Sequence, residues 1–133
     1  MSNLFEADLV SSQNLGSSFL ETLAKRDFDG LSQYFDPQVQ SRLLISGGLL
    51  TPSDVKGLIG RFQQWFGEAD HFKMASCQIT MLGDCLAMVY SLQLHKGDGW
   101  YLVQQQTYCD VKGGRIKSFD LLCSGFRPIP EPG

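Results

Sequence analysis

The sequence lacks the residue spacings that hold a metal ion or form a redox disulfide. None of its four cysteines, Cys77, Cys85, Cys109 and Cys123, forms part of a Cys-x-x-Cys or Cys-x-x-His arrangement. A zinc site needs close-spaced ligand pairs of this kind. Each cysteine stands instead in a strand-like segment among apolar neighbours, which is typical of small core residues in a reducing compartment. We therefore expect no metal site, no cofactor and a cytoplasmic protein.

Long apolar runs and clusters of positive charge are also missing. The longest apolar runs are a few residues, far short of the roughly 20 that a membrane span needs. The densest basic pair is Lys25 with Arg26, and the net charge is −3, which argues against a general attraction to nucleic acid or anionic lipid. The first ten residues contain Glu6 and Asp8 and no basic region, unlike a secretory signal. We expect neither nucleic acid nor a membrane as partner.

The remaining composition is that of an ordinary globular protein. The chain has 133 residues, of which 43% are hydrophobic and 19% charged. This length is typical of one domain with a sizeable core. We expect a single domain over residues 1–133, with a loosely attached lead-in at 1–10 and a proline-rich tail, neither helix nor strand, at 127–133.

Residues 51–67 carry the clearest local signal, an amphipathic helix. Thr51 is the expected N-cap, Pro52 suits the first helical position, and Asp54 stands at the third position of a capping box. Gly67 is expected to end the helix in the left-handed conformation. Apolar residues recur on one face of a 3.6-residue period: Val55, Leu58, Ile59, Phe62, Trp65 and Phe66. This face predicts packing against a large apolar surface.

The other elements follow from periodicity and turn residues. Helical spacing predicts a helix over 12–26 and a short helical piece over 27–35, and alternation predicts a strand over 38–45. Four further strands are expected over 73–82, 85–95, 100–111 and 115–126. Short glycine-containing links separate these strands, which is typical of hairpins. The second half is therefore predicted to be a curled antiparallel meander whose concave face the helices fill.

This order resembles the nuclear transport factor two-like superfamily, with its SnoaL-like (polyketide cyclase-like) group looking nearest. The stretches that carry the resemblance are Phe19 with Leu20, residues 34–37 (YFDP), 42–45 (RLLI) with Gly47 and Gly48, 61–67 (RFQQWFG) and 113–116 (GGRI). The resemblance implies a cone-shaped α+β fold, with N-terminal helices packed on a strongly curved mixed or antiparallel sheet. It also implies a ligand pocket between the helices and the concave face. Function varies widely on this fold, so the resemblance is weak for the reaction.

Asp120 is the best candidate for a catalytic acid or base. Alternation divides the last strand into two faces, and placing Lys117 outside puts Asp120 inside. A carboxylate among Phe119, Leu121 and Leu122 would be partly desolvated, which raises a carboxyl pKa towards values useful for proton transfer. The resemblance also implies an acid on the sheet near this region. The alternative is a surface or hydrogen-bonded aspartate on an edge or dimer face.

Arg42 and Tyr90 are the other catalytic candidates. An inward Arg42 would pair with Asp120 or hold an oxygen of a ligand, and the alternative is an arginine on the outer face. Tyr90 offers an apolar wall with one polar tip, although a core tyrosine is the simpler interpretation. This chain lacks the second inward aspartate of the Asp–Arg–Asp set in limonene epoxide hydrolase. It also does not match the Tyr/Asp/Asp set of ketosteroid isomerase. The residues expected to line a ligand are Phe19, Phe62, Trp65, Tyr90, Gln104 and Leu122.

Two functions remain open at this point. One is a pocket protein that binds a small hydrophobic molecule in the cone, with the sheet serving as a homodimer face. The alternative is an acid–base enzyme of the isomerase, cyclase, dehydratase or epoxide hydrolase type, which uses Asp120 and no cofactor.

Overall fold

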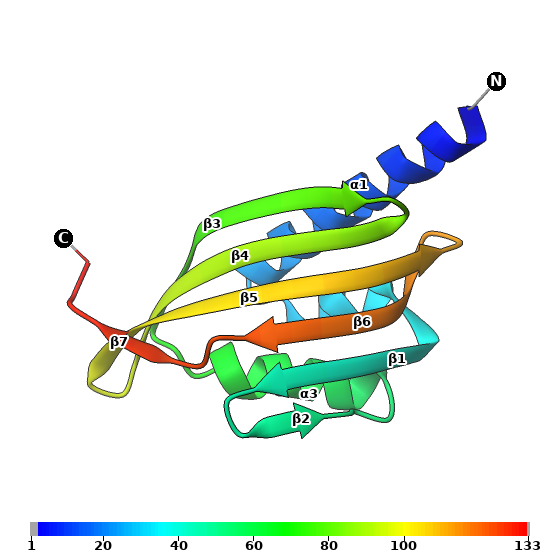
Figure 1. Ribbon diagram of the computed structural model, residues 1–133. Coiled ribbons are helices and arrows are strands. Elements are labelled where there is room, and N and C mark those ends of the chain that lie inside the picture. Colours follow the sequence, from blue (N-terminus) through cyan, green and yellow to red (C-terminus); the bar gives the residue numbers. More distant parts are fainter. Residues whose placement is uncertain (1–2, 133) are drawn as a thin grey trace.

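All helices lie on one face of a curved mixed sheet (Figure 1). The computed structural model describes the backbone of residues 3–132 and the side chains of residues 8–132. Its helical elements are α1 (Asn3–Ala24), α2 (Phe28–Leu31), the 3₁₀ turn η1 (Ser32–Tyr34) and α3 (Val55–Phe66). Its strands are β1 (Phe35–Ile45), β2 (Gly48–Leu50), β3 (His71–Leu82), β4 (Cys85–Lys96), β5 (Gly99–Lys112), β6 (Arg115–Cys123) and β7 (Arg127–Ile129). The α+β fold class predicted from the sequence is confirmed.

The sheet combines one antiparallel meander with one parallel pair. The strand order is β2-β1-β6-β5-β4-β3, and the short β7 pairs with the beginning of β5. Strands β3 to β6 are antiparallel neighbours, whereas β1 runs parallel to β6. The turns of the meander use Gly83, Gly97, Gly113 and Gly114 at positive φ, as the hairpin signals predicted. Residues 127–129 were expected in a tail that is neither helix nor strand, but they form β7, so that expectation is wrong. Gly133 of the tail lies outside the described residues.

A helix forms where the pattern over 51–67 predicted one, but it begins at Val55, so Pro52 is not its first helical residue and three other end signals were also misread. Asp54, and not the expected Thr51, is the N-cap, because its Oδ1 accepts a hydrogen bond from the Gly57 N–H at 2.8 Å. Gly67 has a right-handed φ of −67°, so the expected left-handed end is wrong. The position still favours glycine, because the Cβ of any other residue would clash with the Gln63 carbonyl oxygen at 2.5 Å.

Helix α1 is longer than the periodicity predicted. It begins at Asn3 rather than near Ser12, so helix covers most of the predicted lead-in, whose residues 1 and 2 lie outside the described part. Gly16 lets this helix lie close to the sheet, because a Cβ there would stand 3.2 Å from Leu86 and 3.4 Å from Ile79. Within the described residues, none of the helices combines the length and apolar character needed to cross a lipid bilayer.

Aromatic side chains fill the space between the helices and the sheet. Phe62 of α3 lies 6.3 Å from Phe19 of α1 and 6.2 Å from Phe119 of β6, measured between ring centroids. Phe35 lies 5.2 Å from Phe119, and all four rings are 0–2% exposed. Edge-to-face contacts of this kind add to the stabilisation from apolar burial. The interior of the cone is therefore occupied by the protein's own side chains.

Candidate functional site

A β-bulge in β6 decides which way Asp120 points. Ile116 pairs with Val111 and Ser118 pairs with Asp110, so the register shifts at Lys117 and two consecutive residues share one position. Beyond the bulge, Phe119 and Leu121 face the helices and are buried, whereas Ser118, Asp120 and Leu122 face the other side. The expectation that Asp120 points inward is wrong, because strict alternation from Ile116 does not hold across a bulge.

Asp120 and Arg42 form an ion pair on the face of the sheet that no helix covers. Arg42 Nε donates to Asp120 Oδ1 at 2.8 Å, and Nη2 donates to Oδ2 at 2.7 Å. The two residues are register partners in the parallel pair of β1 and β6. Their side chains are 67% and 40% exposed. The hydrogen bonds to Asp120, and then its negative charge, raise the pKa of Arg42. The structure thus brings these two predicted residues together, but in solvent.

Tyr90 lies on the opposite, helix-covered face and belongs to a buried polar network. Its Oη donates to Gln105 Oε1 at 2.6 Å, and Gln105 Nε2 donates to Cys123 Sγ at 3.4 Å. Tyr90 and Gln105 are 1% and 0% exposed. Burial raises the pKa of Tyr90 well above its usual value. The hydroxyl is therefore neutral and already satisfied, and it lies away from Arg42 and Asp120.

The predicted ligand-lining residues divide between the two faces of the sheet. Phe19 and Phe62 are fully buried, and Trp65 packs against the Phe62 ring at 5.6 Å. Gln104 and Leu122 are exposed on the uncovered face instead. No single cavity therefore contains the whole predicted set.

The helix-covered side is open at one end, in a cleft between α1 and two hairpin turns. The cleft has a volume of about 300 Å³. Leu9 of α1, Met81 of β3 and Val111 of β5 supply its apolar surface, and Ser11 and Ser12 add hydroxyl groups. Its remaining lining residues are Asp8, Asp84, Lys112, Gly113 and Gly114. None of these residues was predicted from the sequence to line a ligand site, because the cleft depends on α1 beginning well before residue 12.

Thiol and metal chemistry have little support in the described part of the chain. No group of three or more His, Cys, Asp or Glu side chains there has a metal-binding arrangement. Cys109 is buried, and burial raises the pKa of its thiol, which keeps it a weak nucleophile. Cys77 is exposed on β3, so the expectation that every cysteine is a core residue is wrong.

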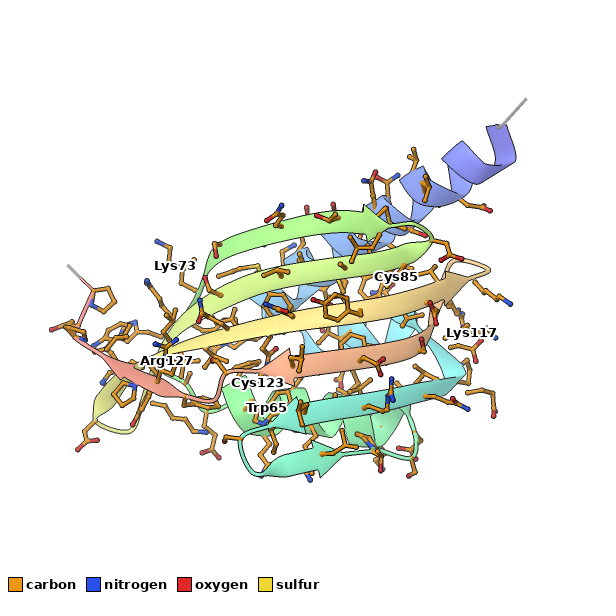
Figure 2. The ribbon with its side chains drawn as sticks, viewed as in Figure 1. Trp65, Lys73, Cys85, Lys117, Cys123 and Arg127 are labelled. Atoms are coloured by element: carbon orange, nitrogen blue, oxygen red, sulfur yellow. The ribbon has the colours of Figure 1, made fainter. Side chains whose placement is uncertain are left out.

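The uncovered face carries a row of exposed aliphatic side chains that the sequence interpretation missed. Register pairs align Leu49 with Leu44, Leu44 with Leu122, Leu122 with Gln106, and Gln106 with Val89. We call Leu49, Leu44, Leu122 and Val89 the apolar row; they are 59%, 47%, 42% and 41% exposed. Alternation groups Leu44 with Arg42 on one face of β1, but the partners of Leu44 required the sheet register. The face is seen directly in Figure 2.

Comparison with known proteins rests on structure alone. No protein-family model and no curated protein matches the sequence. A candidate polyketide cyclase from Xanthomonas campestris pv. campestris matches with a TM-score of 0.70 at 12% identity, covering 86% of this chain and 91% of that one. A protein of unknown function from Burkholderia pseudomallei, called nuclear transport factor two-like, matches at 0.67 and 13% identity, covering 84% and 88%. The chain has the nuclear transport factor two-like fold.

A third similar structure with this fold is an LEH-like epoxide hydrolase from M. tuberculosis. It has a TM-score of 0.64 at 14% identity, and the match covers 86% of this chain and 84% of that one. The nuclear transport factor two-like fold predicted from the sequence is therefore confirmed over most of the chain. At these identities the likeness establishes architecture, and the function has to be argued from the residues of this chain.

Proposed function

We propose that this protein binds a small hydrophobic molecule in the cleft between α1 and the hairpin turns, as a SnoaL-like pocket protein that does not catalyse acid–base chemistry. The observation that carries the proposal is the position of the cleft. It lies between a helix and the helix-covered face of the sheet, and both walls contribute apolar side chains. Concave, mainly apolar clefts with a few polar groups are the usual sites for small ligands.

The size of the cleft limits the ligand. Its volume of about 300 Å³ is at the lower end of the range for ligand sites. The aromatic core closes the interior beyond it, because Phe19, Phe62 and Phe119 are fully buried. The hydroxyl groups of Ser11 and Ser12 offer hydrogen bonds to one polar group of such a ligand. These features favour a compact apolar molecule that carries one oxygen function.

The absence of a desolvated carboxylate argues against the acid–base alternative. Proton transfer from carbon acids or epoxides uses a carboxyl group whose pKa the surroundings have shifted. Among residues 8–132, no aspartate or glutamate is buried. Asp120 lies across the sheet from the cleft and is held by Arg42, while Asp8 and Asp84 at the rim are exposed. The comparisons include proteins named for cyclase and epoxide hydrolase activity, which fits small organic ligands without requiring catalysis.

The test is to fill the cleft and measure binding of an apolar probe. Val111→Trp places an indole where Val111 now lines the cleft, so the affinity for 1-anilinonaphthalene-8-sulfonate is expected to fall at least about tenfold. The matched control is Val89→Trp, the same change in a strand valine of the uncovered face. Fluorescence titration of both variants and the unchanged protein supplies the comparison.

Two outcomes decide against this proposal. Equal loss of probe affinity in Val89→Trp and Val111→Trp would show that the probe does not report the cleft. Retained affinity in Val111→Trp, with its melting temperature unchanged, would place binding elsewhere. Asp120→Asn belongs in the same series. This variant should leave the probe affinity unaltered. If the unchanged protein converts a ketone or epoxide substrate and Asp120→Asn abolishes that conversion, the enzymatic alternative is restored.

A further inference from the structure

The chain's only two histidines lie side by side, although they are far apart in the sequence. The antiparallel pairing of β3 with β4 makes His71 and His95 register partners, and their ring centroids are 6.1 Å apart. Both rings face away from the helices, because the neighbouring Phe72 packs on Phe66 and the neighbouring Leu94 is fully buried. Spacing in the sequence, from which no metal site was expected, could not reveal this pair, since only the sheet register brings the two rings together.

Asp70 fixes the tautomer of His95. His95 Nδ1 lies 2.7 Å from Asp70 Oδ1, and the His95 side chain is 21% exposed. The hydrogen bond with His95 holds the pKa of Asp70 below its usual value, so Asp70 is a carboxylate, which accepts hydrogen bonds and donates none. The proton of a neutral His95 therefore lies on Nδ1, and Nε2 carries a free lone pair. A carboxylate placed behind an imidazole in this way is the usual partner of a metal-bound histidine.

Trp100 holds both imidazole rings in place. It is the register partner of His95 in β5, at a ring-centroid distance of 5.2 Å, and it stacks on His71 at 5.5 Å with an interplanar angle of 24°. Packed rings have little rotamer freedom left, which lowers the entropy cost of bringing two ligand nitrogens to one ion. A metal ion lies about 2.1 Å from an imidazole nitrogen, so two rings that share an ion have centroids roughly 5 to 6 Å apart. A small turn of the exposed His71 ring meets this distance.

The charges around the pair favour a cation as ligand. Lys96 follows His95 in β4, but its Nζ donates to the Gln64 carbonyl oxygen of α3 at 3.4 Å, on the helix-covered side. Lys73 is exposed further along β3, where solvent screens its charge. Asp70, by contrast, is in direct contact with His95. The charge that touches the pair is therefore negative, which attracts a cation rather than an anion.

We propose that His71 and His95 bind one divalent transition-metal ion of the Zn²⁺ or Cu²⁺ type, with Asp70 orienting His95 and water completing the coordination. Imidazole nitrogen suits these ions, whereas Mg²⁺ and Ca²⁺ prefer oxygen ligands. Two protein ligands are fewer than the three or four of dedicated zinc sites, and the described residues hold no such larger group, so the site is open and the ion exchangeable. The pair lies by the β4–β5 turn, at the opposite end of the sheet from the proposed ligand cleft, so the two sites are independent (Figure 1).

The test is calorimetric titration of the untagged chain with Zn²⁺ near neutral pH, with its cysteines kept reduced. His71→Gln and His95→Gln each remove one ligand nitrogen, so the dissociation constant for Zn²⁺ should rise at least about a hundredfold. Asp70→Asn keeps both ligands and should raise it about tenfold. In NMR spectra Zn²⁺ should shift the ring signals of both histidines, which are the only imidazole signals of this chain. Without metal, the ¹⁵N shifts of His95 in Asp70→Asn should lose the uniform Nδ1–H pattern, which a merely structural role of Asp70 would not change.

The matched control is Asp29→Asn, the same change in an exposed aspartate of α2. This variant should bind Zn²⁺ within about twofold of the unchanged affinity, and Mg²⁺ should give no binding heat with any variant. Equal Zn²⁺ affinity in the unchanged protein and both histidine variants would overturn the proposal and assign the ion to another group, such as the exposed Cys77. Absence of Zn²⁺ and Cu²⁺ binding by the unchanged protein would overturn it as well. Equal losses in Asp70→Asn and Asp29→Asn would remove the orienting role of Asp70.

Discussion

At the scale of single residues, Asp36 connects the beginnings of the two parallel strands. Its Oδ2 lies 2.8 Å from Lys117 Nζ, and its Oδ1 accepts a hydrogen bond from the Gln38 N–H at 2.7 Å. Lys117 is the bulge residue of β6 and lies close to the start of β1 (Figure 2). The hydrogen bond from Lys117, and then that from Gln38, hold the pKa of Asp36 below its usual value.

This lowered pKa predicts a pH-dependent effect of Asp36→Asn. A carboxylate with a depressed folded-state pKa stabilises the protein above its unfolded pKa of about 4, and the contribution is lost as pH falls through the folded-state value. The variant should melt about 3 °C or less below the unchanged protein at pH 7, since the pair is partly exposed. The gap should narrow as the pH falls below about 4 and the carboxyl group of Asp36 takes up its proton. Thermal unfolding followed by circular dichroism at pH 7 and at low pH measures this difference in melting temperature. Asp98→Asn, in a hairpin turn, is the control and should melt with the unchanged protein at both pH values.

Residue chemistry was predicted more successfully than residue orientation. A contact between Arg42 and Asp120 was expected if Arg42 pointed inward, and the pair forms on the outer face instead. Tyr90 does lie on the buried face of its strand. The side on which Asp120 lies was not predicted, because one extra residue at Lys117 exchanges the faces of β6 and leaves no local signal in the sequence. The catalytic role proposed for Asp120 depended on an inward side chain, whereas the bulge directs Asp120 away from the helices.

At the scale of elements, α3 is the helix that joins the two halves of the core. Phe62 in its centre packs against rings from α1, β6 and α3 itself, at centroid distances of 5.6 to 6.5 Å. The pattern of apolar residues over 51–67 predicted this face correctly, because a buried helical stripe depends on local spacing. Local spacing could not predict β7. Its three residues include Pro128, and it forms a strand only because β5 extends to meet it.

Truncation of Phe62 should therefore destabilise the whole fold. Phe62→Ala removes a fully buried ring and leaves a cavity between α1, α3 and the sheet. The free energy of unfolding should fall by about 3 to 5 kcal/mol. Gln63→Ala, at the next and exposed position of the same helix, should change it by no more than about 0.5 kcal/mol. Urea unfolding of both variants supplies the measurement, and comparable losses would contradict the assignment of Phe62 to the core.

At the scale of the whole molecule, one sheet separates the cleft from the apolar row. The cleft uses side chains that face the helices, such as Met81 and Val111, whereas the apolar row uses side chains that face away from them. Successive residues of a strand alternate between the two faces, so both surfaces share the same backbone without sharing side chains.

This separation predicts that binding and assembly are lost independently. Val111→Trp should bind the apolar probe weakly and keep the oligomeric state of the unchanged protein. Leu122→Glu should bind the probe within about twofold of the unchanged affinity, and any change in the sedimentation mass should be confined to this variant. Probe titration and sedimentation equilibrium on the same two preparations test both statements. Loss of both properties in either variant would mean that the two surfaces are coupled.

The bulge at Lys117 also has a consequence for how chains with this architecture can change over time. If the same residues ran through β6 without the bulge, strict alternation from Ile116 would turn Ser118, Asp120 and Leu122 towards the helices. A carboxylate would then enter the interior without any substitution. The same residues can therefore present an acid to either side of the sheet, so relatives with nearly identical residues in this strand could differ completely in chemistry.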